Sequence, residues 1–452
     1  MRWSTKYYFI VLSGLLYLFP GMVLGETLPQ AVEHMIRTNP KIKAQISNKL
    51  ARDEEIVQSR AEYFPKVDLQ GGIGVEEYTE PNDRSLDPRE VILRLRQNVF
   101  AGFQSVNEVD RQKARTRSSA YRLRSATDNI ALQVGKVYLS VLKNQELADL
   151  ATENEVLHER ITDQVSLRSE SGVSRKVDFD QVEGRLALAK SNTVIARINL
   201  VDAQTNYQAI VGRVPIDLTM PEAVDSCIPE SLDTAKKFAL ENHPTLLSAN
   251  TDLTARKIQN KVARANFWPQ LDLEVDKYWG EDVDGVEGKT EYLAGWVRLR
   301  YNLFNGWNDK ARKNETVYLE DEAREIRNNT GRQVLESIEL SWMANQAVTD
   351  RIKYLEQRVA SASATSEAYA KQFNIGQRTL LDVLDTSAEL IDAKKDLISA
   401  KYDRLTAQFR ILNGMGNLTQ SLGLAYPEEA LVGDDKEQDY PEEESDTGKD
   451  NG

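Results

Sequence analysis

The chain has 452 residues, a single cysteine and a formal net charge of −13. Its 41% hydrophobic and 28% charged residues are typical of a folded protein, and its length allows two or three domains or one large repeated domain. Cys227 has no partner for an internal disulfide, and His34, His158 and His243 are scattered, so the composition excludes a disulfide scaffold and a histidine–cysteine zinc site.

Residues 1–25 are predicted to be a secretory signal peptide. Arg2 and Lys6 supply positive charge, Tyr7–Pro20 is mostly apolar, and small or neutral residues precede a cleavage point before Glu26. The alternative is an N-terminal anchor helix, but the apolar run is shorter than the roughly 20 residues that span a membrane. No other run is long enough, so we expect an exported chain that enters a membrane only as β-strands.

The rest of the chain is predicted to be an internally duplicated domain, with repeats at 26–229 and 230–427. The two halves match at a constant offset of 204 residues, so their elements have equal lengths. The matches pair Leu28 with Leu232, Asn39-Pro40 with His243-Pro244, Ser59–Leu69 with Ala263–Leu273, Gly172 with Gly376, Asp178 with Asp382, and Gly212 with Gly416.

Each repeat is predicted to contain short helices, a β-hairpin, a long helix and a return helix. Alternating apolar and charged residues indicate the hairpins, and proline-free stretches with apolar residues three and four apart indicate the long helices, each roughly 100 Å at 1.5 Å per residue. The predicted hairpins are 66–99 and 270–303, the long helices 102–170 and 306–374, and the return helices 175–211 and 378–412.

The final stretch, 428–452, is predicted to be a disordered acidic tail. It contains eleven acids and two bases, which gives a net charge of −9. The acidity of the chain therefore lies mostly in this tail. The body has no basic patch, so we expect no nucleic-acid partner.

Four strands per chain are too few to enclose a channel, because the smallest outer-membrane barrels have about eight. If the apolar faces meet lipid, several chains must share one barrel, since lipid does not tolerate open sheet edges. Arg94, Arg96, Arg298 and Arg300 on the charged faces are then expected to line a water-filled lumen. The alternative is a soluble sheet packed on helices.

The stretch from Gln372 to Asp385 is predicted to be a helix–turn–helix tip that carries a gate. Gly376 interrupts a helical pattern, and its twin Gly172 marks the other tip. Asp382 and Asp385 are three residues apart and share one helix face, so copies around one axis would focus a negative potential. The alternative is a pair of ordinary acids in the first turn of a helix.

Phe373–Asp385 closely resembles the periplasmic tip of the TolC family of outer-membrane channels, and Arg60–Pro65 before the first strand is also similar. The resemblance covers about Leu28 to Leu422. It implies a mixed α and β fold that is mostly α and internally duplicated. Three chains would form a long coiled-coil helical barrel and a trimeric transmembrane β-barrel of twelve strands, with four strands per chain.

The resemblance also implies roles for residues and partners. Asp382 and Asp385 would form the carboxylate rings of the periplasmic gate, and Arg378 and Asp178 the polar contacts that keep it closed. Phe373 stands where the family's namesake has a tyrosine. The partners would be two further copies of the chain, a periplasmic adaptor (membrane fusion) protein, an inner-membrane transporter of the ABC type and outer-membrane lipid, in a Gram-negative bacterium with the helices in the periplasm.

The function most favoured is an exit duct for type I protein secretion, because the expected mature N-terminus has no cysteine for lipid attachment and the second tip resembles type I exporters. One alternative is the exit duct of a multidrug or metal efflux pump. Another is a soluble periplasmic coiled-coil scaffold without a pore. The sequence has no phosphate-binding loop, nucleophile elbow or metal-ligand cluster, so we expect neither catalysis nor a cofactor.

Overall fold

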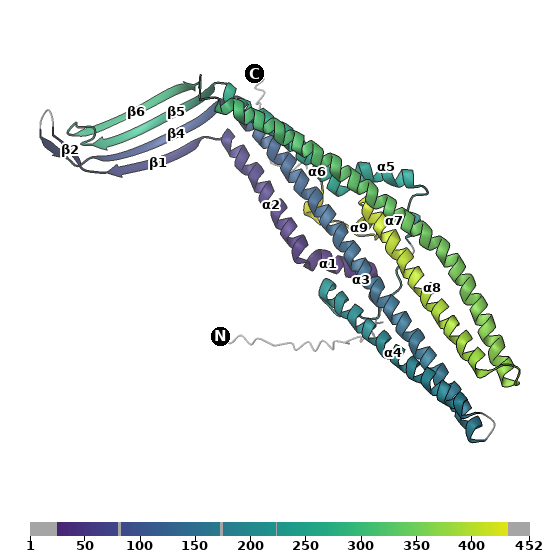
Figure 1. The fold of residues 1–452 in the computed structure, drawn as a ribbon. Coiled ribbons are helices and arrows are strands. Elements are labelled where there is room, and N and C mark those ends of the chain that lie inside the picture. The colour runs from purple at the N-terminus through teal and green to yellow at the C-terminus, as the bar shows by residue number, and fades with distance from the viewer. Residues whose placement is uncertain (1–24, 80–82, 172–174, 223, 433–452) are drawn as a thin grey trace, which may run out of the picture.

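The computed structural model describes residues 25–79, 83–171, 175–222 and 224–432. Two long helical hairpins extend from a four-stranded sheet, and short helices lie against their middle (Figure 1). The first repeat consists of α1 (Leu28–Thr38), α2 (Pro40–Arg60), β1 (Lys66–Ile73), β2 (Glu76–Tyr78), β3 (Arg84–Leu86), β4 (Arg89–Ala101), α3 (Gln104–Glu170) and α4 (Lys176–Val211). The second consists of α5 (Leu232–Asn242), α6 (Pro244–Ala263), β5 (Gln270–Glu281), β6 (Lys289–Arg300), α7 (Asn308–Asn374), α8 (Leu380–Met415) and α9 (Leu418–Ser421).

The duplication is visible in the element lengths. The long helices α3 and α7 both have 67 residues, and the return helices α4 and α8 both have 36. This confirms the predicted mixed fold, mostly α and internally duplicated. None of the helices in the described ranges has both the length and the apolar character needed to cross a membrane.

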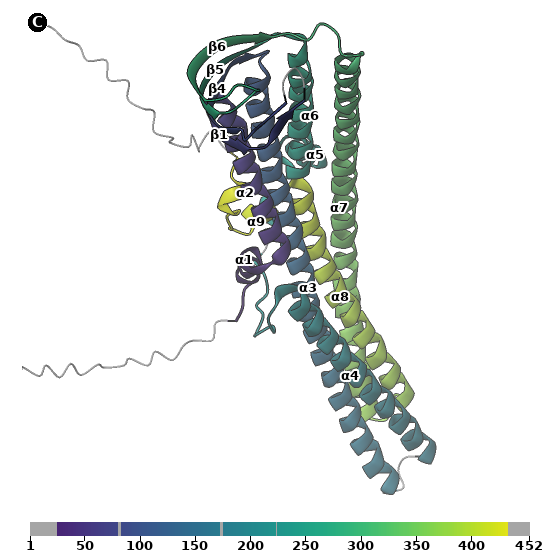
Figure 2. The same ribbon diagram turned by 90° about the vertical axis from the view of Figure 1, so that its left-hand side faces the viewer.

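The helices form one curved layer. Towards the sheet, α2 packs on α3, α3 on α6, and α6 on α7. Towards the tips, α4 packs on α3, α3 on α8, and α8 on α7 (Figure 2). The long helices α3 and α7 therefore run the whole length of the layer, from the sheet to the tips. The shorter helices complete the layer at each end.

The main sheet has the order β1-β4-β5-β6, and all its pairs are antiparallel. The hairpins of the two repeats therefore join side by side, with β4 next to β5. The register shifts between Asn98 and Phe100, which is a bulge near the helical end of the sheet. Within the described residues, β1 and β6 are the outer strands.

The first hairpin differs from the continuous one predicted over 66–99. Strand β1 ends at Ile73, and β2 and β3 pair as a separate two-stranded sheet. Glycine weakens strands, and three glycines in Gly71–Gly74 interrupt the alternating pattern here. The Gly74 N–H donates to the Pro88 carbonyl, which closes the main ladder before the small sheet begins.

The chain passes from sheet to helix through the same backbone turn in both repeats. Gly102 and Phe103 have φ values of 60° and 65°, and Gly306 and Trp307 have 65° and 67°. A Cβ on Gly102 would lie 2.5 Å from the Ala265 carbonyl oxygen, so only glycine fits there. The turn is thus fixed both by the left-handed backbone and by close packing.

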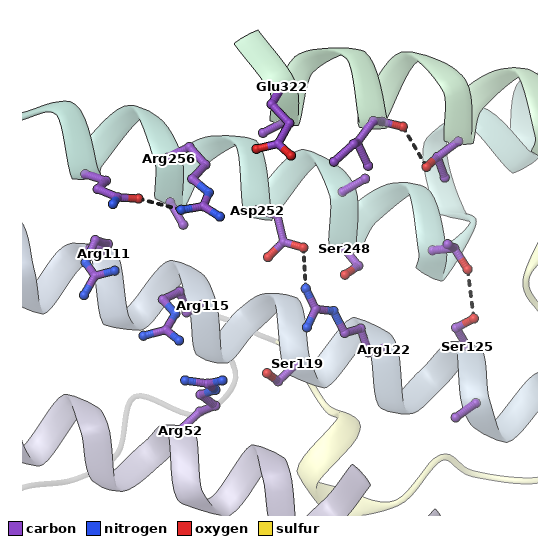
Figure 3. A pocket seen from close by; sticks show the side chains of 18 of the residues that line it. Arg52, Arg111, Arg115, Ser119, Arg122, Ser125, Ser248, Asp252, Arg256 and Glu322 are labelled. Carbon is purple, nitrogen blue, oxygen red and sulfur yellow. Dashed lines mark hydrogen bonds and ion pairs between the residues drawn. The ribbon is translucent and has the colours of Figure 1, made fainter. Parts of the chain in front are cut away.

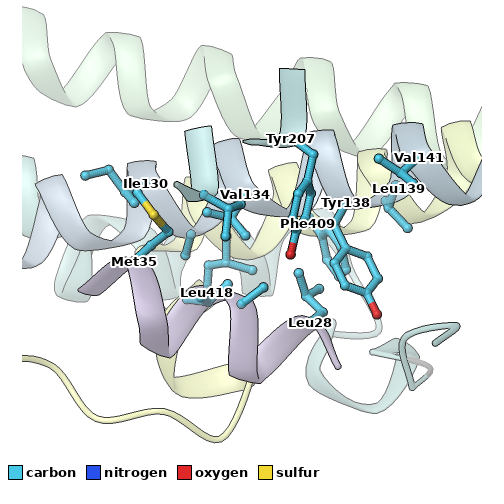
Figure 4. Packing of buried hydrophobic residues seen from close by; sticks show 14 of the residues in the cluster. Leu28, Met35, Ile130, Val134, Tyr138, Leu139, Val141, Tyr207, Phe409 and Leu418 are labelled. Atoms are coloured by element: carbon cyan, nitrogen blue, oxygen red, sulfur yellow. The ribbon is translucent and has the colours of Figure 1, made fainter. Parts of the chain in front are cut away.

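The main core lies where α1 and α9 cover the long helices (Figure 4). Leu28 of α1, Val134 and Tyr138 of α3, Tyr207 of α4 and Phe409 of α8 are buried there. Tyr138 Oη lies 2.7 Å from the Glu26 carbonyl and 2.5 Å from the Thr219 carbonyl, so its hydroxyl holds two loops against the core. This core braces the middle of the helical hairpins.

The first residues of the segment predicted to be a disordered tail, 428–432, are part of the described structure. Glu428–Ala430 forms a 3₁₀ turn, Ala430 is fully buried, and its carbonyl accepts a 2.6 Å hydrogen bond from Arg124 Nε. The apolar Ala430 and the Arg124 contact outweigh the local acidity. Residues 433–452 lie outside the described residues.

Candidate functional site: the helical tips and the charged sheet face

The second tip is a compact turn between α7 and α8. Gly376, with φ 78°, follows the last helical residues, and its N–H donates to the Phe373 carbonyl at 3.0 Å. The Gln377 N–H donates to the Gln372 carbonyl at 2.9 Å. These two bonds form the Schellman motif that commonly ends helices at glycine. Gly172 of the first tip, which matches Gly376, lies outside the described residues.

Asp382 caps the start of α8. Its Oδ2 accepts hydrogen bonds from the Thr379 hydroxyl at 2.8 Å and the Thr379 N–H at 3.1 Å, and Thr379 Oγ1 accepts from the Asp382 N–H. The hydroxyl bond, followed by the backbone bond, lowers the pKa of the Asp382 carboxyl below its ordinary value. Asp382 is therefore a fixed negative charge at the tip as well as a helix cap.

Asp385 lies one turn further along α8 and contacts the other hairpin. Its Oδ1 accepts a 3.0 Å hydrogen bond from Arg185 Nη2 of α4. The Asp385 side chain is 59% exposed and the Arg185 side chain 35%. Sequence reasoning missed Arg185, because a pair 200 residues apart leaves no local pattern.

Arg378 is held within its own tip. Its Nε donates to Gln372 Oε1 at 3.1 Å, and its guanidinium lies 4.2 Å from the centre of the Tyr369 ring. The distance from Nη1 to Asp382 Oδ2 is 4.0 Å. The arginine is thus stacked and oriented by α7.

The first tip is built differently. Asp178 Oδ2 accepts a 3.2 Å hydrogen bond from the Arg175 N–H at the start of α4. Asp178 therefore occupies the same helix-capping position as its twin Asp382. In the first tip the residue before the helix is basic, whereas Thr379 precedes α8, so the two tips present different charges.

An apolar cluster joins all four helices behind the tips. It contains Val165 of α3, Val182 of α4, and Leu380 and Leu384 of α8, and Phe373 of α7 packs against it. The guanidinium of Arg168 lies 5.1 Å from the centre of the Phe373 ring. Phe373 thus links α7 to the cluster and to Arg168 by packing and a cation–π contact. It has no hydroxyl, so it cannot make the hydrogen bond that a tyrosine could make at this position.

The charged face of the sheet is a ladder of ion pairs between strands. Arg94 Nε lies 2.9 Å from Asp276 Oδ1. Glu274 binds Arg298 at 2.6 Å and Arg96 at 3.3 Å, and its side chain is nearly buried. The remaining rungs are Arg300 with Asp272 and Asn98 with Asp272. The structure thus brings the four predicted lumen arginines, Arg94, Arg96, Arg298 and Arg300, onto one paired surface.

The opposite face of the sheet is apolar and exposed. Leu93 and Val275 alternate with the charged residues, and Leu293, Val297 and Leu299 on β6 are each about two-thirds exposed. Alternation along a strand places such residues on one side. Large apolar surfaces of this kind mark contact with lipid or with another protein.

Comparisons with known proteins agree with this architecture. A family model described as "Outer membrane efflux protein" matches residues 31–213 and 237–417, one match in each repeat. The chain is 23% identical over 421 residues to the outer membrane efflux protein BepC of Brucella suis, covering 92% of this chain and 91% of BepC. It is 21% identical over 391 residues to outer membrane protein TolC of Vibrio cholerae, covering 84% and 88%.

The fold is also that of solved outer-membrane channels. The crystal structure of the Campylobacter jejuni CmeC outer membrane channel superimposes with a TM-score of 0.75 and 15% identity, covering 89% of this chain and 87% of that chain. The family matches span most of the sequence. The chain therefore belongs to the outer membrane efflux protein family, which confirms the TolC-type fold and the outer-membrane location with periplasmic helices that the sequence predicts.

Proposed function

We propose that three copies of this chain form one continuous tube, the outer-membrane exit duct of a tripartite export system. An inner-membrane transporter and a periplasmic adaptor protein deliver the substrate to its tip. The observation that carries this proposal is the sheet, which has one apolar face, one charged face and an unpaired strand at each edge of its described part. The sheet continues into a layer of helices that likewise has two uncovered edges.

The sheet cannot enter lipid as a single copy. Outer strands β1 and β6 leave backbone hydrogen-bonding groups on both edges, and hydrocarbon offers them no partners. Pairing β1 of one copy with β6 of the next satisfies both edges. Three copies give twelve strands, with the apolar faces in lipid and the ladder of ion pairs around a water-filled lumen.

The helical layer has exposed apolar residues at its two edges, which favours the same assembly. Helices α4 and α7 form these edges near the tips. Apolar residues three and four apart share a helix face, and such faces pack together in coiled coils. The exposed apolar residues are Leu188, Ile195, Ile198 and Val201 on α4, and Leu340, Met343 and Tyr354 on α7.

The assembly can be tested with one edge variant and a matched control. Ile198→Glu places a charge in the expected α4–α7 contact and should abolish the trimer, because burying an unpaired charge costs several kcal/mol. Asn199→Glu adds the same charge to the neighbouring exposed polar position and should leave the trimer intact. The measurement is the mass of the detergent-purified protein by light scattering. A monomeric wild-type protein, or identical behaviour of the two variants, would count against the tube.

In the trimer the two tip carboxylates act as the periplasmic gate. Asp382 and Asp385 of three copies place six negative charges around one narrow opening, which favours cations. Arg378 and Asp178 would contact neighbouring helices and keep the gate closed. Opening then requires the helices to move, and the Arg185–Asp385 pair is one contact within each copy that this movement would strain.

For the cargo we propose proteins of a type I secretion system, with an ABC-type transporter as the pump. The second tip, Phe373–Asp385, supports this choice because it resembles the tip of type I exporters. The similarity to the outer membrane efflux protein BepC favours an efflux duct as the second candidate. Deleting the gene separates them: loss of a large secreted protein supports secretion, whereas unchanged secretion with increased drug sensitivity supports efflux.

A further inference from the structure

A cavity of about 730 Å³ lies between α2, α3, α6 and α7, near the sheet end of the helical layer (Figure 3). Five arginines line it, together with Asp252, Glu322 and several serine and threonine hydroxyls. The arginines come from three helices: Arg52 from α2, Arg111, Arg115 and Arg122 from α3, and Arg256 from α6.

The cavity opens on one particular face of the helical layer. Arg111, Arg115 and Arg122 are four and seven residues apart, so they project from one side of α3. Arg124 projects from the opposite side, because two residues turn a helix by about 200°. Arg124 holds the Ala430 segment, so the cavity and that C-terminal segment lie on opposite faces. Residues of four neighbouring helices line the cavity, so it spans the width of the layer on the face opposite the Ala430 segment.

The acidic partners nearby are already engaged. Glu55 accepts hydrogen bonds from Arg52 at 2.6 Å and from Arg115 at 3.0 Å, so one carboxylate serves two arginines. Glu108 binds Arg111 at 2.6 Å. Asp252 binds Arg122 at 2.5 Å, as the dashed line in Figure 3 marks.

Positive charge is in excess within this group. Counting Glu55, Glu108, Asp252 and Glu322 gives four carboxylates against five arginines. Arg256 donates to the neutral side chain of Gln259 at 2.8 Å. Each guanidinium has five N–H donors, and one or two carboxylate contacts leave several of them free to bind a further acceptor.

The arginines also repel one another. Burial and then the nearby Arg52 lower the pKa of Arg115, and Arg111 acts in the same direction. The Arg52, Arg111 and Arg115 side chains are only 23–32% exposed, so water screens this repulsion incompletely. An anion placed between them would relieve it through charge-assisted, bidentate hydrogen bonds.

We propose that this arginine cavity binds small multivalent oxyanions, phosphates or carboxylates, on the face of the helical layer opposite the Ala430 segment. Its location in the lumen rests on the proposed function, because that face lines a tunnel only when three copies assemble. On α3 the cavity is lined from Arg111 to Asn129, and the helix continues for 41 residues beyond Asn129 to Glu170, or about 60 Å. The Debye length is about 8 Å in physiological salt, so this site is electrostatically independent of the acidic gate.

Isothermal titration calorimetry on the full-length, detergent-purified protein tests the proposal, with pyrophosphate in one arm and citrate in the other. Arg256→Gln should weaken binding about tenfold, the size expected for losing a charge-assisted contact. This variant leaves no carboxylate without its arginine, so the fold should be retained. Combining it with Arg111→Gln and Arg115→Gln should abolish binding.

Arg324→Gln is the matched control. It removes the same charge from α7, but Arg324 follows Glu322 by two residues, projects away from the cavity and pairs with Glu320. Its affinity should equal that of the wild type. Binding of only one of the two anions narrows the class to phosphates or to carboxylates. No heat with either anion, or equal weakening by Arg256→Gln and Arg324→Gln, would overturn the proposal. Whether the protein is a conducting trimer is decided separately by mass and conductance, so the two proposals fail independently.

Discussion

Arg185 Nη2 donates a 3.0 Å hydrogen bond to Asp385 Oδ1, and this pair links return helix α4 of the first repeat to return helix α8 of the second. The same carboxylate is one of the two predicted gate charges. Each copy thus contains a contact that ties its two hairpins together and neutralises one of the charges of the proposed gate.

Replacing Arg185 by Gln should open the gate more often. An exposed ion pair contributes about 0.2–1 kcal/mol, so opening should become up to about fivefold more favourable for each copy that loses the pair. Single-channel recording in a planar bilayer measures this. The reversed pair, Arg185→Asp with Asp385→Arg, should restore closure, and a reversed pair as open as the single variant would show that the contact plays no part in gating.

Asp382→Asn with Asp385→Asn should reduce cation selectivity and increase conductance. Asparagine keeps the oxygen that accepts from Thr379, so the cap of α8 survives while six charges leave the trimeric opening. Alanine at Asp382 would also cost about 1 kcal/mol of capping energy, which makes it a less specific test. The reversal potential in a salt gradient is the measurement. If the double asparagine variant selects cations as strongly as the wild type, these residues are not the gate.

Gly376→Ala should loosen the second tip by about 1 kcal/mol. A Cβ at Gly376 meets no atom within 4 Å, so the cost arises from the φ of 78° alone. Gly184→Ala is the matched control: it also has open space, but it lies within α4, where alanine should stabilise the helix by up to about 1 kcal/mol. Hydrogen exchange of the tip amides should increase for the first variant only. Equal exchange in both would contradict the role of the turn.

Acid should destabilise the second repeat through His243. Its Nδ1 caps α6 by accepting from the Thr245 N–H at 3.2 Å, and burial lowers its pKa to about 4. The unfolded chain, with the ordinary value near 6.5, therefore binds more protons between pH 4 and 6.5, and stability falls as the pH drops through that window. The loss is at most about 3 kcal/mol per chain.

His243→Asn should remove this pH dependence. The twin residue Asn39 caps α2 through Oδ1, which accepts from the Lys41 N–H at 2.8 Å, so asparagine fits the position. Thermal unfolding midpoints at pH 7.5 and pH 5 give the comparison. A variant that loses as much stability on acidification as the wild type would assign the effect to another group.

Much of the fold follows from patterns that operate over short distances. The glycine at 376, the prolines that begin α2 and α6, and the alternation of Leu271–Val275 each act within a few residues, so the sequence predicts those turns, helix starts and strands. Because the two repeats match at a constant offset, each element predicted in one repeat is also predicted at the matching position in the other. This is why both long helices could be placed.

Contacts between distant segments could not be predicted in the same way. The Arg185–Asp385 pair and the arginine cavity depend on how curved helices lie against one another, and no spacing rule in the sequence encodes that. The break after Ile73 and the buried Ala430 also differ from the predicted continuous hairpin and disordered tail. Alternation and acidity are local properties, whereas the pairing of β1 with β4 and the burial of Ala430 depend on neighbouring segments.

The turn that joins sheet to helix places an exposed aromatic ring at the same level in each repeat. Phe103 and Trp307 occupy left-handed backbone positions, where glycine would be easier, and both rings remain more than half exposed. Phe304 and Trp268 pack edge to face against them. Aromatic rings favour the boundary between hydrocarbon and water. In the assembled tube these rings would form a girdle at the membrane surface. The girdle would set how deeply the protein sits in the bilayer and therefore how far its helices extend into the periplasm.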